Sequence, residues 1–183
     1  MPSKEPIRSP DEVRLRLTGF SLAAVLLAAT VLAQATLLAR VRFFGASPNL
    51  VLVVVVSWGL LQSIEEGLVW GFLAGLATDA ISGMPLGTSS LALMAGCLFA
   101  GVGERPVFQR HLFLPMIGVA AATPVYAWLI LASEAVRRLP VDWGGTTVRV
   151  IIPELLLNVV LITVVFPVLR WLAARSGAER MGW

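Results

Sequence analysis

Two carboxylates that interrupt long apolar runs are the residues of this sequence best suited to carry chemistry. Asp79 lies in an apolar stretch of the first half, and Glu154 lies near the start of the last apolar run. An ionisable group that faces lipid costs about 2.5 to 3.5 kcal/mol at the centre of a membrane helix. We therefore expect Asp79 to lie against a neighbouring helix or a cavity.

Three interpretations of Asp79 are open at this point. The carboxylate can sit at a helix end, where it reaches the outer interface or pairs with an arginine. It can form a fixed contact that orients helices or a partner. It can also belong to a proton or cation relay, but relays usually need several ionisable groups along a path. Here Glu154 is the other intramembrane candidate.

Asp79 also belongs to a regular series. Six residues of this stretch follow one another at intervals of four: Gly67, Gly71, Gly75, Asp79, Gly83 and Gly87. If the first five are helical, they form a ridge without side-chain bulk, which a partner helix can approach closely. The series predicts a helix-packing or partner interface. Gly83 either ends this ridge or caps the helix, because glycine and proline between Ser82 and Gly87 predict a turn.

A second polar group is predicted near the start of the last helix. Glu154 and Asn158 are four residues apart and share one helix face, and Pro153 before them frees a backbone carbonyl. Together with Asp79 they are expected at one depth in the membrane, as a polar cluster that either holds the helices together or forms the floor of a small cavity. Interhelical polar contacts in membranes average only about 0.6 kcal/mol, so stability alone is a modest reason for such groups.

Other familiar types of site have no support in the sequence. The glycine series lacks the strand and the lysine of a nucleotide site. The single histidine, His111, follows Arg110 at a predicted interface, and the single cysteine, Cys97, lies in an apolar run. One cysteine forms neither an intrachain disulfide nor a metal cluster. We expect no enzyme, no metal and no cofactor.

The composition indicates a membrane protein. Hydrophobic residues make up 57% of the 183 residues, charged residues make up 14%, and the mean hydropathy is +0.85. The apolar fraction and the mean hydropathy exceed those of ordinary soluble domains, and the charged fraction is lower. The basic pI of about 10.0 reflects arginines that flank apolar runs. A nucleic-acid partner is not expected, because no dense basic run is interleaved with aromatics.

We predict an all-α membrane protein whose six transmembrane helices form one compact bundle within residues 16–174, between tails at 1–15 and 175–183. The expected spans are about 17–39, 49–64, 67–82, 86–102, 111–132 and 148–172. The second would be about 24 Å long, less than the roughly 30 Å hydrocarbon core. Either the bilayer thins and the second and third helices both cross, which we favour, or they form a sheltered re-entrant hairpin.

Six crossings put both termini on the same side of the membrane. If that side is the cytoplasm, nine of the 14 lysines and arginines lie inside and five outside. The positive-inside rule favours this orientation, with cytoplasmic N and C termini. The turn at Ser82 to Gly87 is then extracytoplasmic, and Asp79 lies toward the outer leaflet.

Short motifs in two regions carry a family resemblance. The first region contains Pro48-Asn49-Leu50, Glu66-Gly67, Gly71-Phe72, Gly75-Leu76, Asp79, Ser82-Gly83 and Leu86-Gly87, and the last helix contains Pro153-Glu154-Leu155-Leu156 and Asn158. With these motifs the chain resembles the rod shape-determining protein MreD family of bacterial inner membranes. Its departure from that family is a long, arginine-rich loop with Gly144-Gly145 before the last helix.

The resemblance implies a non-enzymatic, multi-pass subunit of the bacterial cell-elongation machinery in the inner membrane. Such a subunit binds MreC and, with the actin-like MreB, RodA and a class B penicillin-binding protein, organises lateral peptidoglycan synthesis and cell shape. The resemblance also implies a fold similar to the substrate-binding S-components of energy-coupling-factor vitamin transporters. An alternative is therefore a subunit that binds or transports a small molecule or lipid precursor. It would need a hydrated cavity lined by Asp79, Glu154, Asn158 and aromatics.

Overall fold

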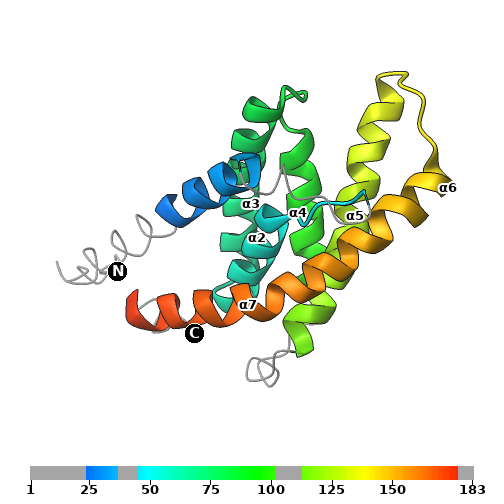
Figure 1. Ribbon diagram of the computed structural model, residues 1–183. Helices are drawn as coiled ribbons and strands as arrows, with labels where there is room; N and C mark the ends of the chain where they lie inside the picture. The colour runs from blue at the N-terminus through cyan, green and yellow to red at the C-terminus, as the bar shows by residue number, and fades with distance from the viewer. Residues whose placement is uncertain (1–23, 37–44, 102–112, 177–183) are drawn as a thin grey trace, which may run out of the picture.

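The computed structural model describes residues 24–36, 45–101 and 113–176, and every regular element within these ranges is helical. The elements are the helix Ala24–Thr36, α2 (Leu50–Leu61), α3 (Ile64–Ser82), α4 (Thr88–Gly101), α5 (Phe113–Val136), α6 (Trp143–Thr146), the π-helical segment η3 (Thr147–Ile151) and α7 (Ile152–Ser176). Figure 1 shows α3 and α4 side by side, with α7 running diagonally across the bundle.

The short helix α2 forms the centre of the bundle. It packs against α3, α4, α5 and α7, and nine of its 12 residues are buried. A helix that is apolar on all sides is typical of a protein core. At 12 residues α2 is about 18 Å long, which is shorter than expected from the sequence. Because protein surrounds it, α2 does not need to match the thickness of a hydrocarbon core.

The boundary between α2 and α3 differs from the predicted one. The second helix was expected to reach residue 64, but α2 ends at Leu61 and α3 begins at Ile64. The cause is Ser63, whose side-chain oxygen accepts a hydrogen bond from the backbone N–H of Glu66 at 3.2 Å and caps α3. Glu65 and Glu66 then occupy the first turn, where the helix dipole favours negative charge.

The last helical rod begins earlier than expected. It runs from Trp143 through α6, η3 and α7, whereas the expected start was residue 148. Asp142 caps its first turn by accepting a hydrogen bond from the N–H of Gly145 at 2.9 Å. In η3 the N–H of Ile152 donates to the carbonyl of Thr147, five residues back. Pro153 has no N–H for the usual bond to residue 149, which explains the widened turn.

Within the described residues, two helices are long and apolar enough to cross a membrane, namely Phe113–Val136 and Trp143–Ala174. Three more described helices are apolar but shorter: Ala24–Thr36, α2 and α4. Helix α3 has 19 residues and carries three carboxylates. An exposed apolar stripe follows α7 at intervals of four (Ile152, Leu156, Val160, Val164 and Val168), as on a lipid-facing helix.

The helical fold and the apolar helices agree with a helical membrane protein. The number of crossings and the side of the termini stay predictions, as does the choice between two crossings and a hairpin for α2 and α3. Within the first predicted span, the structure describes residues 24–36. The predicted N-terminal tail at 1–15 lies outside the described residues, and so does most of the C-terminal one.

Candidate functional site

The glycine face of α3 is buried against helices of the same chain. Near the start of α3, a Cβ atom added to Gly67 would lie 2.8 Å from the Cα atom of Gly59 in α2. One turn further, a Cβ atom on Gly71 would lie 3.7 Å from the Cβ atom of Leu93 in α4. Gly67 therefore lets α2 approach α3 closely, while Gly71 faces α4 at an ordinary van der Waals distance.

The helices α3 and α4 approach each other most closely at Gly75. A Cβ atom at this position would overlap the backbone N and Cα atoms of Ser90 in α4. Backbone atoms of a helix cannot rotate away as a flexible side chain can, so only glycine fits here. The Ser90 hydroxyl donates a hydrogen bond to the carbonyl of Phe72 at 2.9 Å and joins the two helices on the same side. The ridge is thus a packing face within the chain.

Gly83 and Gly87 lie beyond the helical part of the series. Gly83 caps α3 with φ 67°, and Gly87 lies in the following turn with φ 96°. Both angles are in the left-handed region that favours glycine. No atom lies within 4 Å of a Cβ built on either residue. Of the two interpretations of Gly83, the structure shows the cap, and Gly87 shapes the turn to α4.

Asp79 is fully buried and holds the turn between α3 and α4. One carboxylate oxygen accepts a hydrogen bond from the N–H of Gly87 at 2.8 Å, and the other accepts one from the N–H of Ser89 at 3.0 Å. These N–H groups lie at the start of α4, where helix donors lack partners in their own helix. Of the three interpretations, this geometry corresponds to a fixed contact that orients helices.

Asn158 connects three helices. Its side-chain oxygen accepts a hydrogen bond from the N–H of Asn49 at 2.8 Å, just before α2, and its side-chain nitrogen donates to the Thr123 hydroxyl of α5 at 3.2 Å. Asn158 and Thr123 are fully buried. Buried polar groups are normally paired in this way, and here the pairs fix α7 against α2 and α5.

We expect Asn158→Leu to destabilise the protein by about 1 to 2 kcal/mol, because the Asn49 N–H loses its acceptor. The expected loss is small because single polar contacts between membrane helices contribute little to stability. Thermal unfolding of the purified protein in detergent measures this change. The control is Thr163→Val, which removes an exposed hydroxyl that donates to the carbonyl of Val160 of the same helix. Equal melting temperatures for wild type and Asn158→Leu would contradict the structural role.

Glu154 and Asp79 belong to one polar region in which other residues connect them. The Glu154 carboxyl group lies within hydrogen-bonding reach of the side chains of Asn49 and Asn158. The Tyr126 hydroxyl lies within reach of Asn49 and of Ser89, the residue whose N–H binds Asp79. The predicted trio is therefore linked through residues from α4, α5 and the start of α2.

Four of these linking residues were not among the predicted site residues: Asn49, Ser89, Thr123 and Tyr126. A signal existed for Asn49, because an asparagine directly before an apolar run is a typical N-cap, and its side chain does accept from the N–H of Leu52 at 3.0 Å. Tyr126 is the single tyrosine of the chain and lies in an apolar span, where a hydroxyl needs a polar partner.

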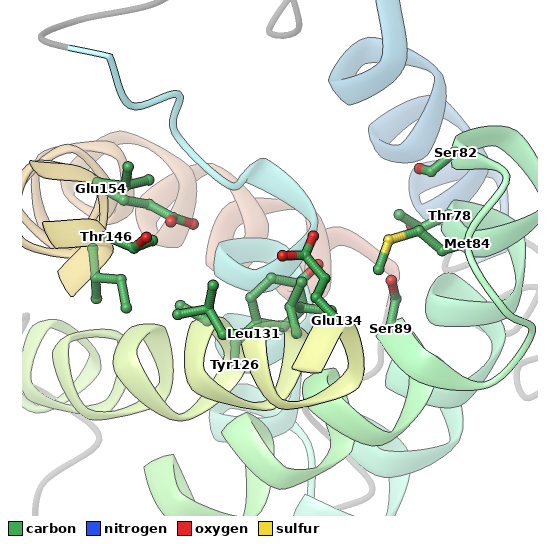
Figure 2. Close-up of a pocket in the computed structure, with 13 residues that line it drawn as sticks. Thr78, Ser82, Met84, Ser89, Tyr126, Leu131, Glu134, Thr146 and Glu154 are labelled. Carbon is green, nitrogen blue, oxygen red and sulfur yellow. The ribbon is translucent and has the colours of Figure 1, made fainter. Parts of the chain in front are cut away.

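A cavity of about 230 Å³ adjoins this region. Figure 2 shows Glu154 and Thr146 on one side of it, the α3–α4 turn with Ser82, Met84 and Ser89 on the other, and Tyr126 on α5 between them. Glu154 and Tyr126 thus line the cavity, as the small-molecule alternative requires. Asp79 and Asn158 are not among the lining residues, because their polar atoms bind backbone and side chains behind the walls.

The described residues define an all-helical protein with membrane-length apolar helices, in which buried polar groups hold the helices in place. A comparison with known protein families matches residues 14–175 to the family described as rod shape-determining protein MreD. The chain therefore belongs to the MreD family of bacterial membrane proteins, which is part of the MreBCD shape-determining system and is not a known family of enzymes. Comparisons with curated proteins and with solved structures found no match.

The family resemblance inferred from the sequence motifs is thus confirmed over most of the chain. The expected similarity to S-components of vitamin transporters stays a prediction.

Proposed function

We propose that this chain is a non-enzymatic subunit of the bacterial cell-elongation complex in the inner membrane and binds MreC directly. With MreB, RodA and a class B penicillin-binding protein, it helps to organise lateral peptidoglycan synthesis and thereby cell shape. The observation that carries this proposal is the family match over residues 14–175.

The packing of α3 on α4 supports a role in assembly. Because the glycine face is occupied within the chain, a partner would contact the opposite faces of these helices. Phe72 and Leu73 on α3 and Leu98 and Phe99 on α4 are 40 to 58% exposed. Aromatic side chains are enriched at protein interfaces, and an apolar surface suits the single membrane helix of a partner. In this proposal the glycine face holds α3 against α4, and this packing positions the exposed faces that contact the partner.

The alternative is an S-component-like subunit that binds or transports a small molecule or lipid precursor. The cavity beside Glu154 and Tyr126 is the observation that favours it. Binding at this cavity and binding of MreC at the outer faces of α3 and α4 are compatible, because they use different surfaces of the chain.

Photo-crosslinking in cells tests the proposed function. A photoreactive phenylalanine analogue replaces Phe72, Phe99 or, as the control on α7, Val160, and the tagged chain is recovered from native membranes. We expect a covalent adduct with MreC from Phe72 or Phe99 and none from Val160. If MreC is absent both from these adducts and from the material that co-purifies with the wild-type chain, direct binding of MreC is wrong.

A further inference from the structure

Two carboxyl groups enter the cavity described above. Glu134 comes from the last turns of α5 and Glu154 from the first turns of α7, and Figure 2 shows both side chains extending into the space between α7 and the α3–α4 turn. The remaining lining residues are Thr78, Ser82, Met84, Ser89, Tyr126, Ala127, Ile130, Leu131, Thr146, Val150 and Ile151. None of these lining residues, all of which belong to the described part of the chain, is a lysine or arginine. The walls of the cavity therefore supply no positive charge.

The size of the cavity limits what it can hold. Its volume of about 230 Å³ is below the usual range of about 300 to 1,000 Å³ for sites of drug-sized ligands. It exceeds by several times the roughly 30 Å³ that one water molecule occupies in the liquid. The space therefore suits a short molecule or the terminal group of a longer one.

The lining combines three kinds of surface. Carboxyl groups lie on α5 and α7, hydroxyl groups come from residues such as Thr78 and Tyr126, and apolar side chains such as Leu131 and Ile151 complete the walls. Each carboxylate accepts hydrogen bonds and favours a positively charged partner. An ammonium group offers this charge and N–H donors, while the apolar walls accommodate a carbon chain.

The backbone of the walls is irregular at two places. Val150 and Ile151 belong to the π-helical segment η3, and Ser82 and Met84 flank the glycine cap of α3. Segments of π-helix occur frequently at functional sites. Here η3 widens the helical rod next to the cavity and immediately precedes the turn that carries Glu154.

We propose that this cavity binds the ammonium group of a small amphiphilic amine through the carboxyl groups that line it, Glu134 and Glu154, with the carbon chain of the amine against Leu131 and Ile151. The same chemistry has two sources, a free amine and the amino headgroup of a phospholipid. The site goes beyond the proposed binding of MreC and does not depend on it, since it requires only the chain itself.

Ligand-induced thermal shifts of the full chain, purified in an uncharged detergent, test the ammonium site. The probes are hexylammonium, hexanol and hexanoate, which share a six-carbon chain and differ in charge. We expect hexylammonium to raise the melting temperature in a saturable way and the other two to have little effect. The double variant E134Q/E154Q removes both charged hydrogen-bond acceptors, and its apparent affinity for hexylammonium should be weaker by about tenfold or more.

Two further variants separate the site from general effects. Glu65→Gln removes an exposed carboxylate at the start of α3, away from the cavity, and should bind hexylammonium like wild type. Ala127→Phe keeps both carboxylates and fills the cavity, so it should lose the shift even if E134Q/E154Q does not fold. A shift by hexanol equal to that by hexylammonium, or an unchanged shift in Ala127→Phe, would overturn the proposal.

Native mass spectrometry then distinguishes the two sources of the amine. The wild-type chain is released from membranes containing phosphatidylethanolamine and phosphatidylglycerol. Selective retention of phosphatidylethanolamine by wild type and its loss in Ala127→Phe identify the lipid headgroup as the ligand. A response to hexylammonium without retained phosphatidylethanolamine identifies a free amine. If hexylammonium causes no shift and phosphatidylethanolamine is not retained, the proposed ammonium site is wrong. This outcome would not affect the proposed binding of MreC, which co-purification tests separately.

Discussion

Gly75→Leu is expected to abolish recovery of the folded chain. Even the first atom of the new side chain, its Cβ, would overlap the backbone of Ser90. Overpacking typically costs about 1 to 3 kcal/mol and occasionally more where the surroundings can adjust, and two helix backbones cannot adjust as side chains do. The three further carbons of leucine would force α3 and α4 apart. Because native proteins are stable by only about 5 to 15 kcal/mol, this change should remove most of the stability.

The measurement is the yield and melting temperature of monodisperse protein in detergent, together with co-purification of MreC and cell shape. The matched control is Ala80→Leu, which adds a leucine to the exposed face of the same helix. We expect Ala80→Leu to resemble wild type and Gly75→Leu to give little folded protein, less MreC and rounded cells. Wild-type stability of Gly75→Leu would contradict the close packing of α3 and α4.

Asp79→Ala is expected to have the second-largest effect, a loss of about 2 to 4 kcal/mol in the free energy of unfolding. The substitution leaves the buried N–H group of Ser89 and the half-buried N–H group of Gly87 without their acceptor at the start of α4, and an unpaired buried donor costs about 1 to 3 kcal/mol. Asp79→Asn retains one acceptor oxygen and should lie between wild type and Asp79→Ala. Chemical or thermal unfolding in detergent measures the series.

Asp142→Ala provides the matched control for this prediction. Asp142 also accepts a backbone N–H, that of Gly145, but it is exposed and water can replace it. We expect Asp142→Ala to cost less than about 1 kcal/mol, as for a typical exposed helix cap. If Asp79→Ala were no more destabilising than Asp142→Ala, the buried carboxylate would not be a structural support. Loss of MreC from a fully stable Asp79→Ala protein would instead indicate that the partner contacts the α3–α4 turn, which Asp79 holds in place.

The packing face of α3 was predictable because helical spacing alone brings its members together. Residues at intervals of four share one face of a helix, and glycines in an apolar helix leave room for a neighbour. The sequence did not identify the neighbour, since the same face would suit any apolar helix. In the structure α4 and α2 occupy it. The last two glycines of the series, Gly83 and Gly87, lie beyond the end of α3, because they adopt positive φ angles that α-helices exclude.

The polar contacts were only partly predictable, because their partners are far apart in the chain. Asn158 binds the N–H of Asn49, 109 residues away, and the hydroxyl of Thr123, 35 residues away. The spacing of Glu154 and Asn158 showed that they share a helix face. It carried no information about which residues of other helices that face contacts.

The start of the last helix was mispredicted because its local signals conflict. Gly144 and Gly145 disfavour a helix, so the sequence predicts a loop around them and a helix only from about residue 148. The Asp142 cap compensates for the glycines, and the helical rod begins at Trp143. Pro153 would ordinarily break a helix, but a π-helical turn just before it removes the need for its missing N–H.

A designed disulfide between α3 and α4 tests the central structural claim most directly. In a Cys97→Ala background, cysteines replace Gly71 and Leu93, whose Cβ positions are 3.7 Å apart. This separation is close to the mean of about 3.8 Å in natural disulfides. The control pair joins Leu93→Cys with Leu73→Cys, which is on the exposed face of α3. Under mild oxidation in native membranes, we predict nearly complete disulfide formation for 71/93 and little for 73/93. Efficient bonding of 73/93 with none of 71/93 would contradict the claim that the glycine face packs on α4.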